Sequence, residues 1–128
     1  MHDKELETAA QAAIKQAYSP YSGFRVGAAL RTQDGKIFAG SNVENASFSL
    51  SICAERVALF KAVSEGHRSF TDLAIVSSSG RPTFPCGACR QVLIEFSQDL
   101  MVHSGDIYSK NILQLLPDKF GLNSIDSS

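Results

Sequence analysis

Residues 85–91 read Pro-Cys-Gly-Ala-Cys-Arg-Gln, and a second short segment, residues 53–56, reads Cys-Ala-Glu-Arg. Each segment follows a loop and opens a stretch whose apolar residues recur as in a helix. Two cysteines three positions apart at a helix start can point toward one metal ion. A third thiolate from another helix start leaves the fourth position of tetrahedral zinc open, as in catalytic sites. The two segments therefore predict a zinc site held by Cys53, Cys86 and Cys89.

Glu55 lies two residues after Cys53, close enough to reach a water in the open position without binding the metal. A helix start also carries a partial positive charge of about half a unit, which favours the thiolate form of cysteine. A glutamate in a first helical turn is ordinarily explained by that same charge. Because Glu55 lies so close to Cys53, we favour a role in proton transfer over that ordinary explanation.

Outward from these segments, the hydrophobic pattern predicts an alternation of helices and strands. Helices are predicted over residues 3–18, 53–65 and 86–96, with a last helical turn over 112–116. Strands are predicted over residues 24–31, 37–40, 73–76, 100–103 and 106–108. This order predicts an α/β fold, a three-layer sandwich in which helices cover both faces of a mixed sheet of about five strands.

Length and composition suit a single domain over residues 1–128, with a loose tail expected over 123–128. Hydrophobic residues make up 44% and charged residues 20%, which supports a packed core. The formal net charge of -1, without a basic stripe, disfavours nucleic acid as a partner.

The compartment is expected to be the cytoplasm. The polar residues 1–5 do not resemble a secretion signal, and no stretch reaches the roughly 18 apolar residues that span a bilayer, so no membrane partner is expected. Three cysteines are an odd number, which is a poor basis for a disulfide framework. In a reducing cytosol, such closely spaced cysteines more often bind metal or act in redox chemistry.

Five segments in the same order resemble the small cytidine deaminases over most of the chain. Besides the two cysteine segments, they are residues 19–29 (Ser-Pro-Tyr-Ser-Gly-Phe-Arg-Val-Gly-Ala-Ala), 42–46 (Asn-Val-Glu-Asn-Ala) and 115–120 (Leu-Leu-Pro-Asp-Lys-Phe). The pattern of a first ligand, one residue, Glu, and a later Pro-Cys-x-x-Cys is typical of zinc deaminases. One segment alone would be modest evidence, whereas five in order are specific.

The resemblance implies zinc-dependent hydrolytic deamination of cytidine and deoxycytidine to uridine and deoxyuridine, with release of ammonia, in pyrimidine salvage. One zinc ion per subunit would activate water for attack on C4 of the base. Glu55 would take the proton of that water, pass it to N3 and then protonate the leaving amine. Phe24 is expected to pack against the base, Asn42 and Glu44 to hydrogen-bond the ribose, and the Ala54 backbone to contact the base edge.

Charge balance gives Arg56 a further role. Zinc with three thiolates carries a net charge of about -1, which opposes deprotonation of water. The helix starts offset part of this charge, and the resemblance has Arg56 donating hydrogen bonds to the thiolate sulfurs. The resemblance also implies a homotetramer in which Ala46, Phe48 and Phe120 contact a neighbouring subunit. Phe48 stands where many relatives carry Tyr.

Several alternatives remain open for these residues. The cysteines could be buried free thiols, or hold a structural zinc with a fourth protein ligand, although His2, His67 and His103 are expected at the surface or in loops. Phe24 and Phe48 could be core residues. Asn42 and Glu44 could be ordinary turn residues, and Arg56 a solvated helix charge.

Three other functions compete with cytidine deamination. The first is deamination of another aminopyrimidine nucleoside, such as blasticidin S. An enzyme that edits polynucleotides would normally carry His as its first ligand and a basic groove. A non-catalytic zinc-binding or redox module would use Cys86 and Cys89, but it would leave Glu55 and the third cysteine unexplained.

Overall fold

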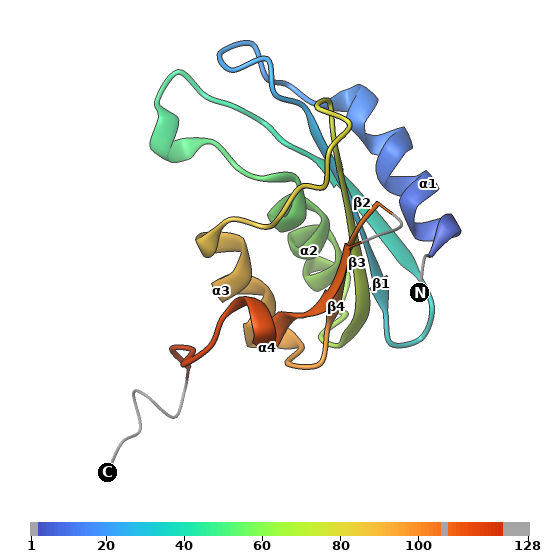
Figure 1. Cartoon of the computed structure of the whole chain (residues 1–128). Helices are drawn as coiled ribbons and strands as arrows, with labels where there is room; N and C mark the ends of the chain where they lie inside the picture. The colour runs from blue at the N-terminus through green and yellow to red at the C-terminus, as the bar shows by residue number, and fades with distance from the viewer. Residues whose placement is uncertain (1–2, 106–107, 122–128) are drawn as a thin grey trace.

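The described residues, 3–105 and 108–121, build a five-stranded sheet in the order β2-β1-β3-β4-β5 (Figure 1). The strands are β1 (Val26–Thr32), β2 (Ile37–Ser41), β3 (Phe70–Ser77), β4 (Met101–Ser104) and β5 (Tyr108–Asn111). β3 and β4 run parallel, whereas the other neighbours are antiparallel. The sheet is therefore mixed and five-stranded, as the sequence predicts.

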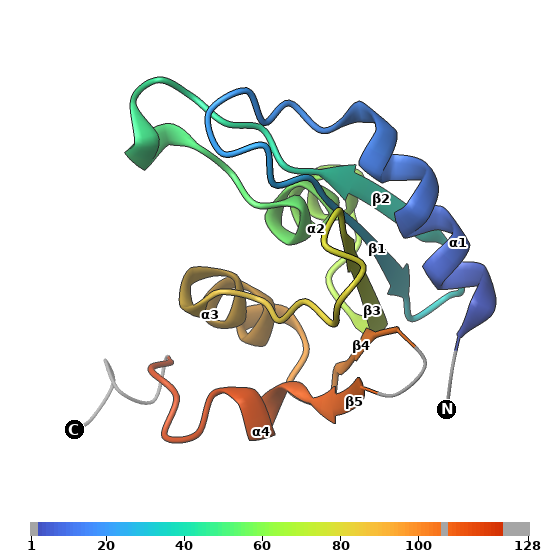
Figure 2. The ribbon, with the colours of Figure 1, turned by 45° about the horizontal axis from the view of Figure 1, so that its top comes forward.

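Helices cover both faces of the sheet. They are α1 (Lys4–Ala13), α2 (Ala54–Ser64), α3 (Gly87–Phe96) and the short α4 (Ile112–Leu115), with 3-10 turns η1 (Ile14–Gln16) and η2 (Phe48–Leu50). α1 lies on one face, and α2 and α3 lie on the other (Figure 2). The predicted three-layer α/β sandwich is confirmed.

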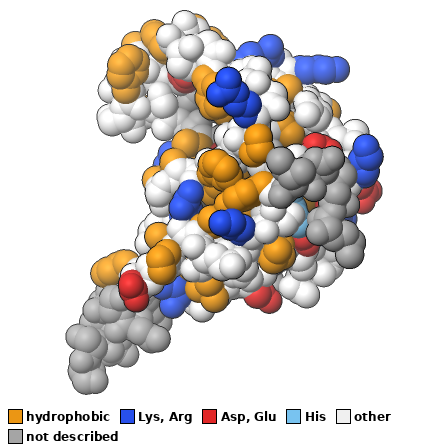
Figure 3. Space-filling model, viewed as in Figure 1, with side chains coloured by type: hydrophobic (Ala, Val, Ile, Leu, Met, Phe, Trp, Pro, Cys, Tyr) orange, Lys and Arg blue, Asp and Glu red, His pale blue; other side chains and the backbone are white. Residues whose placement is uncertain are grey.

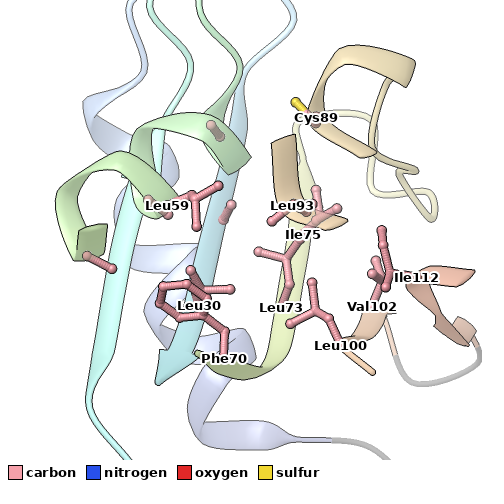
Figure 4. Close-up of a cluster of buried hydrophobic side chains, with 14 of the residues drawn as sticks. Leu30, Leu59, Phe70, Leu73, Ile75, Cys89, Leu93, Leu100, Val102 and Ile112 are labelled. Carbon is pink, nitrogen blue, oxygen red and sulfur yellow. The ribbon is translucent and has the colours of Figure 1, made fainter. Parts of the chain in front are cut away.

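The alternation of side chains along each strand builds a separate core on each face. On β1, Ala28 and Leu30 pack toward α2 and α3, while Ala29 between them packs toward α1. Leu59 of α2 and Leu93 of α3 belong with Leu30 to the larger core (Figure 4). Because this core fixes both helices against the sheet, it also fixes where their N-termini lie.

Several predicted boundaries differ from the structure; β1, for example, begins at Val26 rather than at residue 24. α1 and its 3-10 turn end at Gln16 rather than at residue 18, because Tyr18 pairs with the chain at Val43 instead. β3 extends beyond the predicted residues 73–76 because its whole length pairs with β1. β5 continues to Asn111, pairing with β4, whereas the prediction ended at residue 108.

His103 is a clear correction, because it is buried on β4 and only 7% exposed. Its Nδ1 lies 2.6 Å from Ser109 Oγ, and its Nε2 lies 2.7 Å from Asp72 Oδ2. Both ring nitrogens therefore have partners on neighbouring strands, which removes the main cost of burying an imidazole.

Some predictions fall on residues that the structure does not describe. The strand prediction at residues 106–107, the expected tail over 123–128, and His2 all lie outside the described residues. Among residues 3–105 and 108–121, none of the helices combines the length and apolar character needed to cross a membrane.

Candidate active site

The three cysteines occupy the N-terminal ends of α2 and α3. Cys53 immediately precedes α2, Cys86 immediately precedes α3, and Cys89 lies in the first turn of α3. The Sγ atom of Cys86 lies 3.7 Å from that of Cys53 and 3.5 Å from that of Cys89. All three sulfur atoms lie within 4.8 Å of one another. The cysteine segments at the starts of α2 and α3, which β3 separates in the chain, thus bring three thiols close together.

These distances fit a tetrahedral zinc ion. A Zn–S bond of about 2.3 Å implies neighbouring sulfurs about 3.8 Å apart, close to the separations of the Cys86 sulfur from the other two. The thiols are free rather than disulfide-bonded. Among the described residues, no His, Asp or Glu joins the three sulfurs as a fourth member of the cluster. The donor set therefore suits an ion with one open position, and the structural zinc site with a fourth protein ligand is not favoured.

The thiols differ in how readily they ionise. The pKa of Cys53 is lowered to about 5, chiefly by a hydrogen bond from Cys89 and also by Arg56, against the opposing effect of burial. The pKa of Cys89 is raised, first because it holds the proton shared with Cys53, and then by burial and the charge of Glu55. Of these two thiols, Cys53 is thus the more ready to bind a metal as a thiolate.

Glu55 lies in the first turn of α2 and is only 4% exposed. Burial raises the pKa of its carboxyl to about 7, partly offset by a hydrogen bond from a backbone amide, and the nearby Cys53 charge raises it further. A carboxyl with a pKa near neutrality can both accept and donate a proton at physiological pH.

A cavity of about 260 Å³ opens beside these groups. Cys53, Cys86 and Glu55 line it, as do all four residues predicted to contact a substrate: Phe24, Asn42, Glu44 and Ala54. The surface is hollowed beneath the projecting arm formed by residues 44–52 (Figure 3). The cavity thus brings together the predicted proton carrier, two of the three predicted metal ligands and the predicted substrate contacts.

The predicted ribose contacts are held in place by backbone groups. Asn42 is buried, accepts a hydrogen bond from Val26 N (2.9 Å) and donates one to Phe24 O (2.8 Å). The carboxylate of Glu44 accepts hydrogen bonds from the backbone N–H of Tyr21 and of Ser22, and from the Ser22 hydroxyl, which lowers its pKa.

Phe24 lines the cavity and is 42% exposed, so its interpretation as a core residue is wrong. Arg56 is half-buried on α2, with Nη2 3.5 Å from Cys53 Sγ, so it is not simply a solvated charge. Its Nε is buried and has no hydrogen-bond partner among the described residues. The guanidinium is thus directed toward the sulfurs.

The three residues predicted to contact a neighbouring subunit do not line the cavity. Ala46 and Phe48 lie on the arm. Phe48 is 73% exposed, and its ring lies edge to face with that of Tyr21, so it is not a core residue. Phe120 is exposed near the C-terminal end of the described chain, and its carbonyl accepts a hydrogen bond from Gln91.

Sequence reasoning missed five residues that also line the cavity. They are Val26, Ser51, Ile52, Thr83 and Phe84. Thr83 and Phe84 directly precede Pro85, so their position beside the cysteine segment was the one available signal. Ser51 and Ile52 stand in the same position before Cys53, and the pairing of Ile52 with Val43 holds them at the site. Val26 lies within the quoted segment 19–29, but as an apolar strand residue it was assigned no role in the site.

Three thiols at two helix starts, with a buried carboxyl beside them at a cavity, define a catalytic type of zinc centre. The family model of the cytidine and deoxycytidylate deaminase zinc-binding region matches residues 1–104. The chain therefore belongs to the cytidine and deoxycytidylate deaminase family.

Individual relatives support the same assignment. A cytidine deaminase of Sporosarcina psychrophila is 48% identical over 125 residues, covering 94% of this chain and 92% of the relative. One from Halalkalibacterium halodurans is 50% identical over 109 residues, covering 81% and 83%. A crystal structure of cytidine deaminase from Burkholderia pseudomallei matches with a TM-score of 0.85 at 48% identity, covering 94% of this chain and all of that one.

Proposed function

We propose that this protein catalyses the hydrolytic deamination of cytidine and deoxycytidine, which yields uridine or deoxyuridine and ammonia. The observation that carries the proposal is the convergence of Cys53, Cys86 and the buried Glu55 on one cavity. The similarity to proteins named cytidine deaminase, over most of their length, supports this choice of substrate.

In this proposal Cys53, Cys86 and Cys89 hold one zinc ion per chain. The ion would act as a Lewis acid and would lower the pKa of a bound water to near neutrality. The chain contributes the thiolates, which the two helix starts and Arg56 help to stabilise. The mutual separations of the sulfur atoms support this assignment.

Glu55 is the proposed proton carrier. It accepts one proton from the attacking water and delivers it to N3 of the base. It then takes the remaining proton from the hydroxyl now on C4 and passes it to the departing amine, so that the C4–N bond breaks and water and cytidine become uridine and ammonia. One carboxyl can perform both steps because its raised pKa lies close to the working pH. Its burial also excludes bulk water that would compete for the proton.

The substrate is proposed to lie between Phe24, which packs against the base, and the pair Asn42 and Glu44, which hydrogen-bond the ribose. An amide side chain has two N–H donors and two acceptor sites, and a carboxylate has about four acceptor sites. The backbone contacts of both residues therefore leave capacity for ribose hydroxyls. The Ala54 backbone is proposed to contact the base edge.

The proposed assembly is a homotetramer in which Ala46, Phe48 and Phe120 contact neighbouring subunits. On the projecting arm, Phe48 is 73% exposed and Leu50 is 69% exposed. Exposed apolar surface on a protruding segment favours a protein–protein contact. We propose the cytosol as the compartment, since three closely spaced free thiols persist best in a reducing environment.

One assay tests the proposed activity. Purified protein is incubated separately with cytidine, deoxycytidine, cytosine, blasticidin S and a short cytosine-containing oligonucleotide, and ammonia release is measured. We expect turnover of the two nucleosides well above that of the other three. No turnover of either nucleoside, in protein that contains zinc, would contradict the proposal. Preferential turnover of blasticidin S would favour the alternative deaminase.

A further inference from the structure

Phe84 is an exposed aromatic residue on a firmly held segment. It lies in the loop between β3 and α3 and is 51% exposed. On one side, Thr83 N donates a hydrogen bond of 2.6 Å to Ser104 Oγ. On the other side, the carbonyl of Pro85 accepts one of 2.7 Å from Arg90 Nε. The backbone on both sides of Phe84 is thus fixed to other elements.

A second aromatic residue fixes the ring itself. The rings of Phe84 and Tyr108 meet edge to face, with centroids 4.5 Å apart and an angle of 65° between the planes. Tyr108 is half-buried on β5 against the larger core, and Lys110 Nζ lies 5.7 Å from its ring centroid. Edge-to-face pairs at this separation stabilise one relative orientation of the rings. Tyr108 therefore limits where the Phe84 ring can lie.

Phe84 lines the same cavity as Glu55 and Phe24. An aromatic side chain that is held in place and yet left in water does not contribute its full hydrophobic stabilisation to the folded chain. Binding cavities are typically lined by such rigid apolar groups together with a few polar ones. The location, exposure and rigidity of Phe84 thus all indicate a contact with a bound molecule.

We propose that Phe84 forms a second aromatic wall of the base-binding part of the cavity and that Tyr108 positions its ring. The inference rests on the proposed function, because it takes a pyrimidine nucleoside as the bound molecule. Phe84 makes no proton transfer and contacts the base in the same way before and during the reaction. Such uniform binding affects KM and leaves kcat unchanged.

The test compares Phe84→Ala, Phe84→Trp, Tyr108→Ala and Tyr108→Phe with the unmodified protein. For Phe84→Ala we expect KM for cytidine to rise about tenfold, as for the loss of one base–aromatic stacking contact, with kcat within about twofold. The dissociation constant for uridine, measured by calorimetry, should rise in parallel. Phe84→Trp and Tyr108→Phe keep the rings and should stay within about threefold of the unmodified protein. Tyr108→Ala should raise KM by less than Phe84→Ala.

Leu113→Ala is the matched control, because Leu113 is an exposed apolar residue on α4 that does not line the cavity. Its KM should be unchanged, and zinc content and solution mass should be the same in every variant. Unchanged KM and uridine affinity in Phe84→Ala would overturn the inference, as would a loss of activity that follows zinc content or solution mass. If the unmodified protein with its zinc neither deaminates cytidine nor binds uridine, the proposed function itself fails.

Discussion

At the scale of single residues, Arg56 supplies positive charge that offsets the net negative charge of the proposed zinc site. Three thiolates and Zn²⁺ sum to about -1, and the nearest cationic side chain is the guanidinium whose Nη2 lies 3.5 Å from Cys53 Sγ. Its positive charge helps to lower the pKa of Cys53. Groups placed in this way outside the ligands typically change metal affinity by roughly 10–100-fold.

We therefore expect Arg56→Ala to lose zinc faster than the unmodified protein during dialysis against a chelator. Lys36→Ala is the control, because it removes one positive charge from the exposed turn between β1 and β2. Zinc per chain is measured by atomic absorption at fixed times. Equal rates of zinc loss in Arg56→Ala and the control would show that Arg56 does not help to retain zinc.

At this scale, motif spacing predicted that Glu55 and the cysteines would meet, because the two helix starts carry them to one place. It did not predict Phe84 as a lining residue, since one aromatic in a loop has no periodicity to interpret. The burial of His103 was missed for another reason. Its partners, Asp72 and Ser109, lie on neighbouring strands, and only strand register brings them together.

At the scale of elements, the position of α2 depends on Gly40 in β2. A Cβ atom added there would lie 2.7 Å from Ala58 N and 2.9 Å from the side chain of Val57, both on α2. The helix therefore packs against β2 at a distance that only glycine allows. Because Cys53 and Glu55 lie at the start of this helix, a displacement of α2 would move both side chains away from their positions in the site.

For Gly40→Ala we expect a loss of about 1–3 kcal/mol in the free energy of unfolding, the range typical of overpacking, together with weaker zinc retention. Chemical denaturation and metal analysis measure the two effects. Gly121→Ala is the control, because a Cβ there would meet no atom of residues 3–105 or 108–121 within 4 Å. Unchanged stability and zinc retention in Gly40→Ala would contradict the close packing described here.

The N-terminus of α1 provides a pH-dependent test. Asp3 precedes the helix, accepts a hydrogen bond of 3.1 Å from Leu6 N, and pairs with Arg31 at 2.9 Å. Burial alone would raise the pKa of Asp3, but the Leu6 and Arg31 contacts outweigh it and lower the pKa below 3.8. The ionised carboxylate therefore stabilises the fold above that value, and this contribution is lost as the pH falls through the lowered pKa.

We expect Asp3→Ala to cost about 1 kcal/mol at pH 7, as for loss of a helix N-cap. The difference from the unmodified protein should shrink as the pH falls below about 4, because Asp3 becomes protonated first in the unfolded state and then, at its lowered pKa, in the folded state. Urea denaturation at several pH values measures it. A difference that stays constant between pH 7 and pH 3 would contradict the role of the ionised carboxylate.

Element types were well predicted because hydrophobic periodicity records which face of each segment is buried. Boundaries were less well predicted because tertiary pairing decides them. Tyr18 leaves the helical path to pair with Val43, and β5 extends through polar residues because β4 supplies its hydrogen bonds. Neither pairing can be predicted from the local sequence, because the partners are distant in the chain or set by strand register.

At the scale of the whole molecule, the three-layer arrangement places both helix starts on one side of the sheet. The element order predicted these layers, since strands alternating with helices favour a sheet covered on both faces. The projecting arm was not predicted as such, because residues 44–52 have no regular pattern. Its exposed apolar residues Phe48 and Leu50 would contact further copies of the chain in the proposed tetramer.

We expect a solution mass of about 55 kDa, four times the 13.8 kDa of one chain. Phe48→Asp should lower that mass, because a buried charge at an apolar contact destabilises the assembly. Light scattering after size-exclusion chromatography measures both, and Lys36→Ala is again the control. A mass of one chain for the unmodified protein would contradict the tetramer, and an unchanged mass in Phe48→Asp would exclude Phe48 from its contacts.

The central claim is that three cysteines hold zinc while Glu55 carries the protons, and Glu55→Gln separates these two roles directly. The substitution keeps the size of the side chain but removes its ability to transfer protons. Zinc per chain and cytidine turnover are measured on the same purified sample. We expect about one zinc per chain in both proteins, and a loss of nearly all turnover in Glu55→Gln. Substantial remaining turnover, or zinc far below one per chain in the unmodified protein, would contradict the account.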